Sequence, residues 1–430
     1  MSSGHTTFRT VTDTGLERVL LVSVALGGTS IQQSETAEMT RLVESADGAV
    51  AGTVTQNRER PDAGFFVGRG KAEEIAQQAK SLEVTTIVVN HNLSPGQVNR
   101  LEEITSCKVI DRTELILAIF AVQARTLQAR LRIELAQLKY MLPRLSGMWH
   151  HLDRLGAGIG TRGPGETQLE VDRRRARTRM SSLESKLKAI ESATKVRVRR
   201  RSGMFSVALA GYTNAGKSTL MNRLCDAGVR SEDRLFATLD ATSRRLQLPG
   251  GETVLLSDTV GFINALPRML LSSFRTTLEA VTEADLVLLV TDASDPERVS
   301  HVSTVVATLE EIGAGDIQRI QVWNKCDLEN SSVQDGFRIS ALNGDGIPDL
   351  LEEIQKRRRQ ALDWCRLTMD ICTGETEHWI RANSVIESFK RDFSGGVEVH
   401  CGFYLGLSHA RSHLLSRGVN FDIREYNAVN

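Results

Sequence analysis

The chain has 430 residues, of which 41% are hydrophobic and 25% are charged, and these values exclude a disordered or collagen-like chain. Its length predicts about two to four domains, each large enough to bury a core. Lysine plus arginine and aspartate plus glutamate both number 53, so the formal net charge is zero, which taken alone argues against a nucleic-acid partner.

The charges are nevertheless unevenly distributed along the chain. The net charge is −4 over residues 1–111, +12 over 112–201, −6 over 202–360 and −2 over 361–430. A strongly basic segment between acidic ones is typical of a protein with a polyanionic partner, although a basic run can also form a solvated helix face.

Cysteine spacing and apolar runs bear on where the protein works. The six cysteines lie far apart with no CxxC pair, which favours free thiols in a reducing cytosol over a disulfide framework. The first residues have no apolar core of signal-peptide length, and no apolar run approaches the ~20 residues needed to cross a bilayer. We therefore expect a soluble, cytoplasmic protein without a membrane span. We also expect it to be a monomer.

Residues 18–111 are predicted to form an N-terminal α/β subdomain. The turn from Phe65 to Lys71 contains a GxG pattern, but Glu73 stands where a dinucleotide loop requires a third glycine. We interpret these glycines as a strand-to-helix turn, whose helix start could still hold a phosphate. Short apolar runs that alternate with amphipathic stretches imply a small parallel sheet covered by helices, with strands at 19–25, 49–54, 86–89 and 108–110 and helices at 35–46, 71–82 and 95–104.

Residues 112–201 are predicted to form a basic helical hairpin. Two sets of apolar residues recur at helical spacing, so the two helices could pack antiparallel through these seams. The alternative, a single helix as a free-standing linker, would leave a leucine stripe in water. A glycine-rich stretch at 156–165 predicts a functional or mobile loop between the helices. The seams are Leu131, Leu135, Leu138 and Leu142, and Met180, Leu183, Leu187 and Ile190.

The basic character of this segment is concentrated at its end. Residues 172–201 carry a net charge of +9 and follow the glycine-rich loop, which contains Arg162. Such a charge density holds phosphate backbones by counterion release without reading bases. The alternative is a solubilising linker. The residues that we expect to contact RNA are Arg162, Arg173, Arg174 and Arg175.

Residues 204–360 are predicted to form a nucleotide-binding domain. An apolar strand at 204–210 is followed by GxxxxGKS and an amphipathic helix, which is the setting of a phosphate-binding P-loop. Backbone N–H groups would surround the phosphates, Lys217 would reach the β and γ phosphates, and Ser218 would place its hydroxyl on Mg²⁺. The expected nucleotide contacts are Gly211, Tyr212, Thr213, Asn214, Ala215, Gly216, Lys217, Ser218 and Thr219.

Three later elements identify the nucleotide as GTP. A strand at 253–257 ends in DxxG, whose carboxylate would support the Mg²⁺ shell and whose glycine N–H would bond the γ-phosphate. A strand at 286–290 comes next, and a strand at 319–323 ends in NKxD, whose aspartate would accept hydrogen bonds that guanine supplies and adenine cannot. A short strand at 337–339 delivers a backbone contact to the guanine O6. These contacts are Asp258, Thr259, Val260, Gly261, Asn324, Lys325, Cys326, Asp327, Ser340 and Ala341.

The segment between the P-loop and DxxG is the expected first switch, where a threonine would close over Mg²⁺ while the γ-phosphate is present. Thr238 is the predicted second Mg²⁺ ligand beside Ser218, and Thr242 is the alternative because spacing does not separate them. Lys217, Thr238 and Gly261 are the expected catalytic residues. The switch residues expected to contact GTP are Phe236, Ala237, Thr238, Leu239 and Asp240.

One expected catalytic side chain is absent from the sequence. Ras-like enzymes place a glutamine after DxxG to orient the attacking water, and this chain has Phe262, which cannot hydrogen-bond water. We therefore predict slow intrinsic hydrolysis that depends on a group supplied by a partner, by the switch backbone or by a monovalent cation. Asn214 is a candidate K⁺ ligand, and a loop-capping role is its alternative.

Residues 366–430 are predicted to form a small C-terminal α/β domain. Strands are expected at 367–371 and 397–403, and helices at 375–389 and 407–415. His409 and His413 lie one helical turn apart, but no fourth ligand supports a metal site, so we interpret them as surface histidines.

Seven stretches of the sequence together resemble the HflX family of ribosome-associated GTPases, in the Obg-HflX-like branch of P-loop GTPases related to translation factors. The match runs from about Phe65 to Ala341. GTPase motifs alone fit many translation factors, and RGPGETQLE ahead of the P-loop narrows the resemblance to this family. The stretches are GYTNAGKS, FATLD, DTVGF, NKCD, VIDRT at 109–113, RIELAQL at 132–138 and GIGTRGPGETQLEVDRR at 158–174.

The resemblance implies an α/β fold in which a small α/β subdomain and an antiparallel helical hairpin precede a Ras-like P-loop GTPase domain with a mostly parallel sheet. It also implies binding to the large ribosomal subunit and its rRNA near the peptidyl-transferase centre, and splitting of stalled ribosomes under stress. The family also keeps a hydrophobic residue at the position of Phe262. The family's N-terminal region has also been assigned an ATP-dependent activity. This sequence contains no second P-loop that would support it, so whether the chain has that activity stays open.

Two functional hypotheses follow. In the first, the protein is a GTPase with a slow intrinsic rate that the ribosome stimulates, and its basic hairpin engages ribosomal RNA in the GTP state. In the second, it is a GTP-switched adaptor that binds a protein partner through the leucine seams, with no direct RNA role. Steep salt dependence would favour the first, because counterion release accompanies phosphate contacts.

Overall fold

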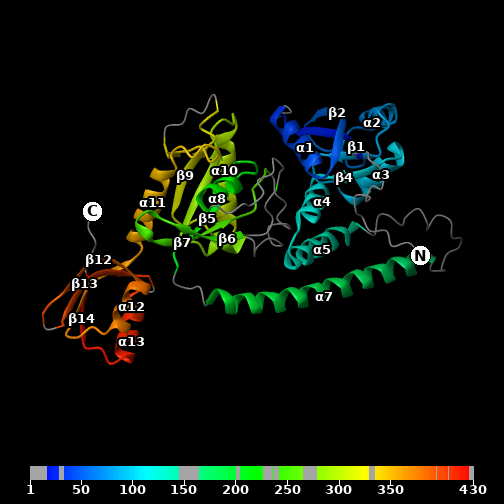
Figure 1. Cartoon of the computed structure of the whole chain (residues 1–430). Helices are drawn as coiled ribbons and strands as arrows, with labels where there is room; N and C mark the ends of the chain where they lie inside the picture. Colours follow the sequence, from blue (N-terminus) through cyan, green and yellow to red (C-terminus); the bar gives the residue numbers. More distant parts are fainter. Residues whose placement is uncertain are drawn as a thin grey trace. The chain divides into compact units, whose positions relative to one another are not determined.

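The computed structural model describes residues 17–28, 33–144, 164–199, 204–225, 236, 242–264, 278–328, 335–393, 395–404 and 406–425, with only the backbone described for 164–169 and 191–199. Contacts divide the chain into two compact units. The first holds residues 1–191, 232–240 and 263–277, and the second holds the remainder. Figure 1 shows the elements of both units, coloured along the sequence.

The first unit is built around a parallel sheet with the strand order β2-β1-β3-β4. β3 is buried at every residue, as expected for an inner strand with helices on both faces. α3 begins with a capping box between Ser94 and Gln97. The predicted parallel sheet is therefore confirmed. Its elements are β1 (Glu17–Leu26), α1 (Gln33–Ser45), β2 (Gly48–Arg58), α2 (Arg69–Ser81), β3 (Thr86–Val89), α3 (Pro95–Thr105) and β4 (Lys108–Asp111).

Helices α4 (Arg112–Gln123), α5 (Leu127–Met141) and α7 (Pro164–Arg199) complete this unit. Figure 1 shows α5 lying beside α7. The predicted seams meet there, because Leu131, Leu183 and Leu187 form a buried cluster with Leu135, Leu138 and Ile190 packed against it. Ion pairs join the helices at both sides of the cluster, Lys139 to Glu184 at 3.0 Å and Arg179 to Glu134 at 2.6 Å. Neither helix is a free-standing linker over this stretch.

The start of α7 corrects one expectation about the glycine-rich stretch 156–165. The helix begins at Pro164, a residue whose fixed φ and missing N–H suit the first helical turn. Pro164 and Gly165 therefore belong to a helix, and the prediction that the whole stretch is irregular is wrong for these two residues. The rest of that stretch, with Arg162, lies outside the described residues.

The second unit begins with a six-stranded sheet of order β10-β9-β8-β5-β7-β6, parallel except for β6. The strands predicted at 204–210, 253–257, 286–290 and 319–323 are confirmed within two residues, and β6 was not predicted. The elements are β5 (Ser206–Gly211), α8 (Lys217–Cys225), β6 (Thr242–Gln247), the 3₁₀ turn η2 (Pro249–Gly251), β7 (Thr253–Asp258), β8 (Leu286–Asp292), α10 (Arg298–Glu311), β9 (Arg319–Asn324), β10 (Phe337–Arg338) and α11 (Ile347–Gln360).

The end of the chain forms a four-stranded antiparallel sheet of order β12-β13-β11-β14. This β-α-β-β-α-β sequence with its strand order is the ferredoxin-like arrangement. α12 and α13 cover one face, where Ile380, Ala410 and Leu414 pack against inward residues of the strands. The elements are β11 (Asp363–Met369), α12 (Gly374–Asn383), β12 (Ser384–Arg391), β13 (Val397–Phe403), α13 (Leu407–Ser416) and β14 (Phe421–Glu425).

The predicted helix 375–389 is wrong in its second half. α12 ends at Asn383, whose side chain donates to the Trp379 carbonyl at 2.8 Å, and the chain continues directly as β12. Val385 and Ile386 are β-branched and pair with Gly402 and Cys401 of β13. Cross-strand pairing therefore overrides the helical periodicity. The strand expected at 367–371 lies earlier, at 363–369, and β14 was not predicted.

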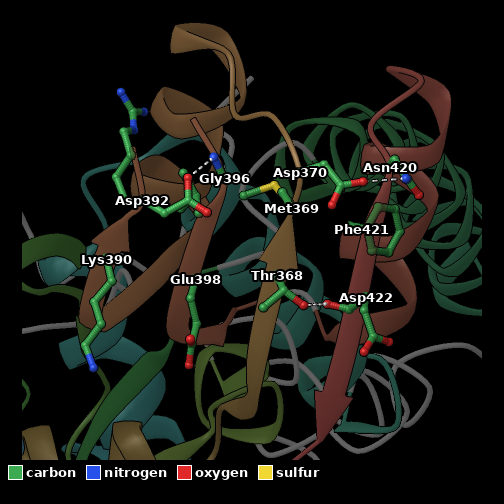
Figure 2. A pocket seen from close by; sticks show the side chains of 12 residues that line it. Thr368, Met369, Asp370, Lys390, Asp392, Gly396, Glu398, Asn420, Phe421 and Asp422 are labelled. Atoms are coloured by element: carbon green, nitrogen blue, oxygen red, sulfur yellow. Dashed lines mark hydrogen bonds between the residues drawn. The ribbon is translucent and has the colours of Figure 1, made fainter. Parts of the chain in front are cut away.

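A hollow of about 680 Å³ lies at one end of this sheet (Figure 2). Within it, Asn420 donates to Asp370 at 2.8 Å, and the backbone N–H of Gly396 donates to Asp392 at 2.7 Å. Both carboxylates are thus engaged within the chain, and we assign no function to this hollow. Its lining is Thr368, Met369, Asp370, Lys390, Arg391, Asp392, Gly396, Val397, Glu398, Asn420, Phe421 and Asp422.

The described residues contain neither a membrane-spanning helix nor a metal-binding cluster. No helix there combines the length and the apolar character needed to span a membrane. Among the same residues, no cluster of histidine, cysteine and carboxylate side chains is arranged to hold a metal ion, and His413 instead stacks on Trp379 with ring centroids 4.1 Å apart.

The seam between α5 and α7 yields a stability prediction. Leu183 is 0% exposed, and truncation of a buried leucine typically costs about 2–5 kcal/mol through lost burial and the cavity left behind. Leu183→Ala should therefore lower hydrogen-exchange protection across α5 and the middle of α7. Leu127→Ala is the matched control, since Leu127 is 67% exposed and its truncation should change protection little. Equal protection in the two variants would contradict the packing described.

Candidate nucleotide-binding site

The carboxyl ends of three parallel strands meet at one edge of the six-stranded sheet. β5 ends at Gly211, β7 at Asp258 and β9 at Asn324. The register places Leu209 opposite Asp258 and Asp292 opposite Asn324. Because the carboxyl edge of an open parallel sheet is where α/β proteins bind ligands, the predicted motifs converge on one site.

The P-loop turns tightly between β5 and α8. A Cβ on Gly211 would lie 2.1 Å from the Val290 carbonyl oxygen, and a Cβ on Gly216 would lie 2.2 Å from Asn324 Nδ2. Gly216 has φ +87° and Asn214 has φ +61°, a region that glycine and asparagine adopt more readily than other residues. The two glycines are therefore required by close approach, which agrees with a loop that wraps phosphates.

Lys217 is buried at the start of α8. Its ammonium donates to the carbonyl oxygens of Gly211 at 3.0 Å and Tyr212 at 2.8 Å, so it lies across the concave side of the loop. Burial lowers the pKa of Lys217 to about 8, and the nearby Asp258 carboxylate opposes that shift. A buried, mostly protonated amine inside such a loop suits a polyphosphate.

Ser218 and Asp258 bring together the two side chains predicted to handle Mg²⁺. The Ser218 hydroxyl donates to Asp258 Oδ2 at 2.7 Å, and Asp258 is 1% exposed. A hydroxyl beside a buried carboxylate offers the hard oxygen ligands that Mg²⁺ prefers, so these residues fit the ion. Thr259 donates from its hydroxyl to the Leu209 carbonyl at 2.6 Å, which fastens the DxxG backbone to β5.

Of the two candidate switch threonines, Thr242 lies among the described residues and Thr238 does not. Thr242 is the first residue of β6, opposite Asp258 in an antiparallel pair, so its backbone belongs to the sheet. Thr238, together with Ala237, Leu239 and Asp240, lies outside the described residues. A threonine that must move between two states is poorly placed inside a sheet, so Thr238 stays our prediction for the second Mg²⁺ ligand.

Phe236, the first residue of the predicted switch contacts, has its ring packed against another aromatic side chain. It is 2% exposed, and its ring meets Phe120 of α4 edge-on, with centroids 4.6 Å apart. Arg112, at the start of α4, donates to the Asn264 carbonyl at 2.8 Å, two residues beyond Phe262. Sequence reasoning foresaw neither contact, because each joins residues more than a hundred positions apart.

The residue after DxxG, Phe262, pairs through its backbone with the P-loop. Phe262 is 2% exposed, its N–H donates to the Gly211 carbonyl at 3.1 Å, and its carbonyl accepts from the Thr213 N–H at 2.8 Å. A Cβ on Gly261 would lie 2.7 Å from Thr213 Cγ2 and 3.1 Å from Lys217 Nζ. Gly261 of DxxG therefore lies in close contact with Thr213 and Lys217, two residues predicted to bind the phosphates.

The NKxD motif joins the phosphate side of the site to its base side. Asn324 donates from Nδ2 to the Ala215 carbonyl at 2.8 Å and accepts from the Ala341 N–H at 2.9 Å. Lys325 pairs with Asp292 at 2.7 Å. The side chain of Asp327 is exposed. It is the residue predicted to accept hydrogen bonds from guanine. The motif thus holds the P-loop and the Ser340–Ala341 turn together.

His301 is a residue near this site that sequence reasoning missed. Its ring stacks on the P-loop Tyr212 with centroids 3.7 Å apart and 11° between planes, and its Nδ1 lies 3.3 Å from Asp295 Oδ2. The local signal was the polar run Asp292-Ala293-Ser294-Asp295 directly after β8, which marks a loop at the same sheet edge. Pairing that loop with a tyrosine some ninety residues earlier requires the fold.

Three of the four residues predicted to contact RNA lie on α7, and Arg162 lies outside the described residues. Arg174 and Arg175 are exposed and Arg173 is half-buried. Arg175 approaches Asp172 at 3.7 Å. Within the described residues, Arg173 and Arg174 take part in no ion pair.

Comparisons with known proteins match residues of both units. Three family models match in succession: "GTP-binding GTPase N-terminal" over 33–121, "GTP-binding GTPase Middle Region" over 123–201 and "50S ribosome-binding GTPase" over 206–325. Among solved structures, the chain resembles a GTP-binding protein from Sulfolobus solfataricus in complex with GDP, at 22% identity and a TM-score of 0.43, covering 79% of this chain and 98% of that one.

Relatives of known sequence extend over most of the chain. GTPase HflX of Alkalihalophilus pseudofirmus is 44% identical over 350 residues, which cover 79% of this chain and 82% of the relative. GTPase HflX of Escherichia coli is 43% identical over 333 residues, which cover 74% of this chain and 78% of the relative.

Lys217 gives the site a pH dependence. Because burial lowers its pKa to about 8, the ammonium is charged below that pH and neutral above it. Phosphate oxygens bind the charged form, so the dissociation constant for GDP should rise about fivefold to tenfold between pH 7 and pH 9. Titration with fluorescent GDP measures this change. Lys217→Met should bind weakly at both pH values with little further change, and a wild-type affinity that stays constant to pH 9 would contradict the assignment.

Proposed function

This chain belongs to the HflX family of GTPases, and from that premise we propose that it acts on the large ribosomal subunit, where its GTP state binds ribosomal RNA and splits or rescues stalled ribosomes under stress. It is a GTP-hydrolysing enzyme. We further propose that it works in the cytoplasm as a monomer. The observation that carries the ribosomal proposal is the exposed basic surface of α7, in a chain that matches a ribosome-binding GTPase model.

The basic surface is held rigidly. α7 is 36 residues long, and its middle is fixed to α5 through Leu183 and Leu187, which are 0% and 7% exposed. The arginines at 173–175 lie about two turns before this seam on the same helix. A fixed array of cations loses less conformational freedom on binding than a flexible tail does. Such an array suits the regular spacing of phosphates on folded RNA.

The same packing argues against the adaptor alternative. An adaptor that binds a protein through the leucine seams needs those leucines at the surface. Leu131, Leu183 and Leu187 are instead buried between α5 and α7. A partner could reach them only by separating the two helices and their ion pairs.

The site suggests how this chain would handle GTP. Lys217 and the P-loop N–H groups would bind the phosphates, and Asn324 would hold the loop against the guanine turn. Ser218, Asp258 and Thr238 would hold Mg²⁺, which when bound neutralises charge on the β and γ phosphate oxygens. Gly261 would contact the γ-phosphate through its N–H. Phe262 supplies no polar group for water, which is the basis for expecting a slow intrinsic rate.

Ribosome binding tests the proposal. The protein loaded with a non-hydrolysable GTP analogue should co-sediment with large ribosomal subunits, and Arg173→Glu, Arg174→Glu and Arg175→Glu combined should abolish this. Binding should also weaken steeply with added salt because counterions are released from phosphates.

A matched control separates the α7 surface from net charge. Arg69, Arg417 and Arg424 lie outside α7 with side chains 81%, 57% and 80% exposed. Their combined replacement by Glu changes the charge equally and should leave co-sedimentation intact. Equal binding by the α7 variant and the wild-type protein would remove this surface from the mechanism.

A further inference from the structure

The P-loop contains a buried hydroxyl for which the described part of the chain offers no hydrogen-bond partner. Thr213 is 7% exposed, and its Oγ1 has no hydrogen-bond partner among the residues that the structure describes. Buried polar side chains in native proteins are almost always bonded, and an exception points to strain, catalysis or a missing ligand atom. Since φ > 0 occurs at Asn214 and not at Thr213, backbone strain does not account for this one.

Thr213 cannot offer its backbone to a ligand in this arrangement. Its N–H donates to the Phe262 carbonyl at 2.8 Å, while Phe262 donates to the Gly211 carbonyl at 3.1 Å. These two bonds, with the bridge between Tyr212 and Phe262, continue the pairing of β5 and β7 into the P-loop. The hydroxyl is therefore the only donor that Thr213 has available.

The neighbours of Thr213 show which part of the nucleotide it would meet. A Cβ on Gly261 would lie 2.7 Å from Thr213 Cγ2, 2.9 Å from its Cα and 3.1 Å from Lys217 Nζ. Thr213 and the Lys217 ammonium thus lie beside the same DxxG glycine. In this loop type the lysine reaches the β and γ phosphates, so Thr213 lies at the triphosphate end and away from the guanine motifs.

We propose that the Thr213 hydroxyl donates a hydrogen bond to a γ-phosphate oxygen of GTP and so serves as a positioning residue that distinguishes GTP from GDP. In hydrolysis, water oxygen bonds to the γ phosphorus, the bond to the β–γ bridging oxygen breaks with its electron pair going to GDP, and the water proton leaves with the released phosphate. Thr213 keeps its own proton throughout. Its bond to the γ oxygen is lost with the phosphate.

This role complements Phe262. Phe262, directly after DxxG, offers no polar side chain at the position where Ras-like enzymes place a glutamine. The Thr213 hydroxyl would supply a polar group from the P-loop instead, beside Gly261. The inference rests on GTP binding alone and is independent of the ribosomal proposal.

Thr213→Val tests the hydroxyl, because valine keeps the β-branched shape and replaces the hydroxyl with a methyl group. Its affinity for a non-hydrolysable GTP analogue should fall about tenfold, with its GDP affinity unchanged within about twofold and single-turnover hydrolysis about tenfold slower. Thr213→Ser keeps the hydroxyl and should restore analogue binding to within about threefold. Thermal unfolding of each variant checks that the loop is intact, and Thr213→Ala provides a second hydroxyl deletion if the valine variant is unstable.

Three outcomes would overturn the proposal. Analogue affinity equal to the wild type in both hydroxyl deletions would show that the hydroxyl is not used. Equal losses for GDP and the analogue would show a general distortion of the P-loop. A serine variant as weak as the valine variant would assign the effect to the methyl group, which packs near Gly261.

Discussion

The nucleotide site depends on how closely the P-loop backbone approaches its neighbours. No Cβ fits at Gly211, against the Val290 carbonyl, or at Gly216, against the Asn324 amide. That approach allows Asn324 to bond both the Ala215 carbonyl and the Ala341 N–H. One side chain at the end of β9 thus couples the loop that would bind phosphates to the turn that would bind guanine, and a substitution at either glycine would separate them.

Two residues close in sequence to the nucleotide motifs pack within the first compact unit. Phe236 packs against Phe120, and the Asn264 carbonyl accepts a bond from Arg112. Arg112 also pairs with Glu38 of α1. Phe236 in the first-switch segment and Asn264, which follows DxxG, are therefore each in contact with α4.

The sequence predicted the nucleotide motifs well because each depends on local spacing at the end of an apolar strand. It also predicted the leucine seam, since helical periodicity determines which residues share a face. It failed at Ser384–Arg391, where pairing with β13 outweighs helical periodicity. It also missed His301 against Tyr212 and the unsatisfied hydroxyl of Thr213, because these follow from contacts between distant segments. The zero net charge conceals the basic segment, and most of the arginines at 173–179 in that segment are exposed on α7.

The central claim is that hydrolysis of GTP is coupled to the ribosome through the basic helix. The most direct measurement is the GTPase rate with and without purified large ribosomal subunits, for the wild-type protein and for the variant with glutamate at 173, 174 and 175. The account predicts a slow rate alone, stimulation of about tenfold or more by the subunits in the wild type, and little stimulation in the variant. A rate that the subunits do not change, or that they raise equally in both proteins, would contradict it.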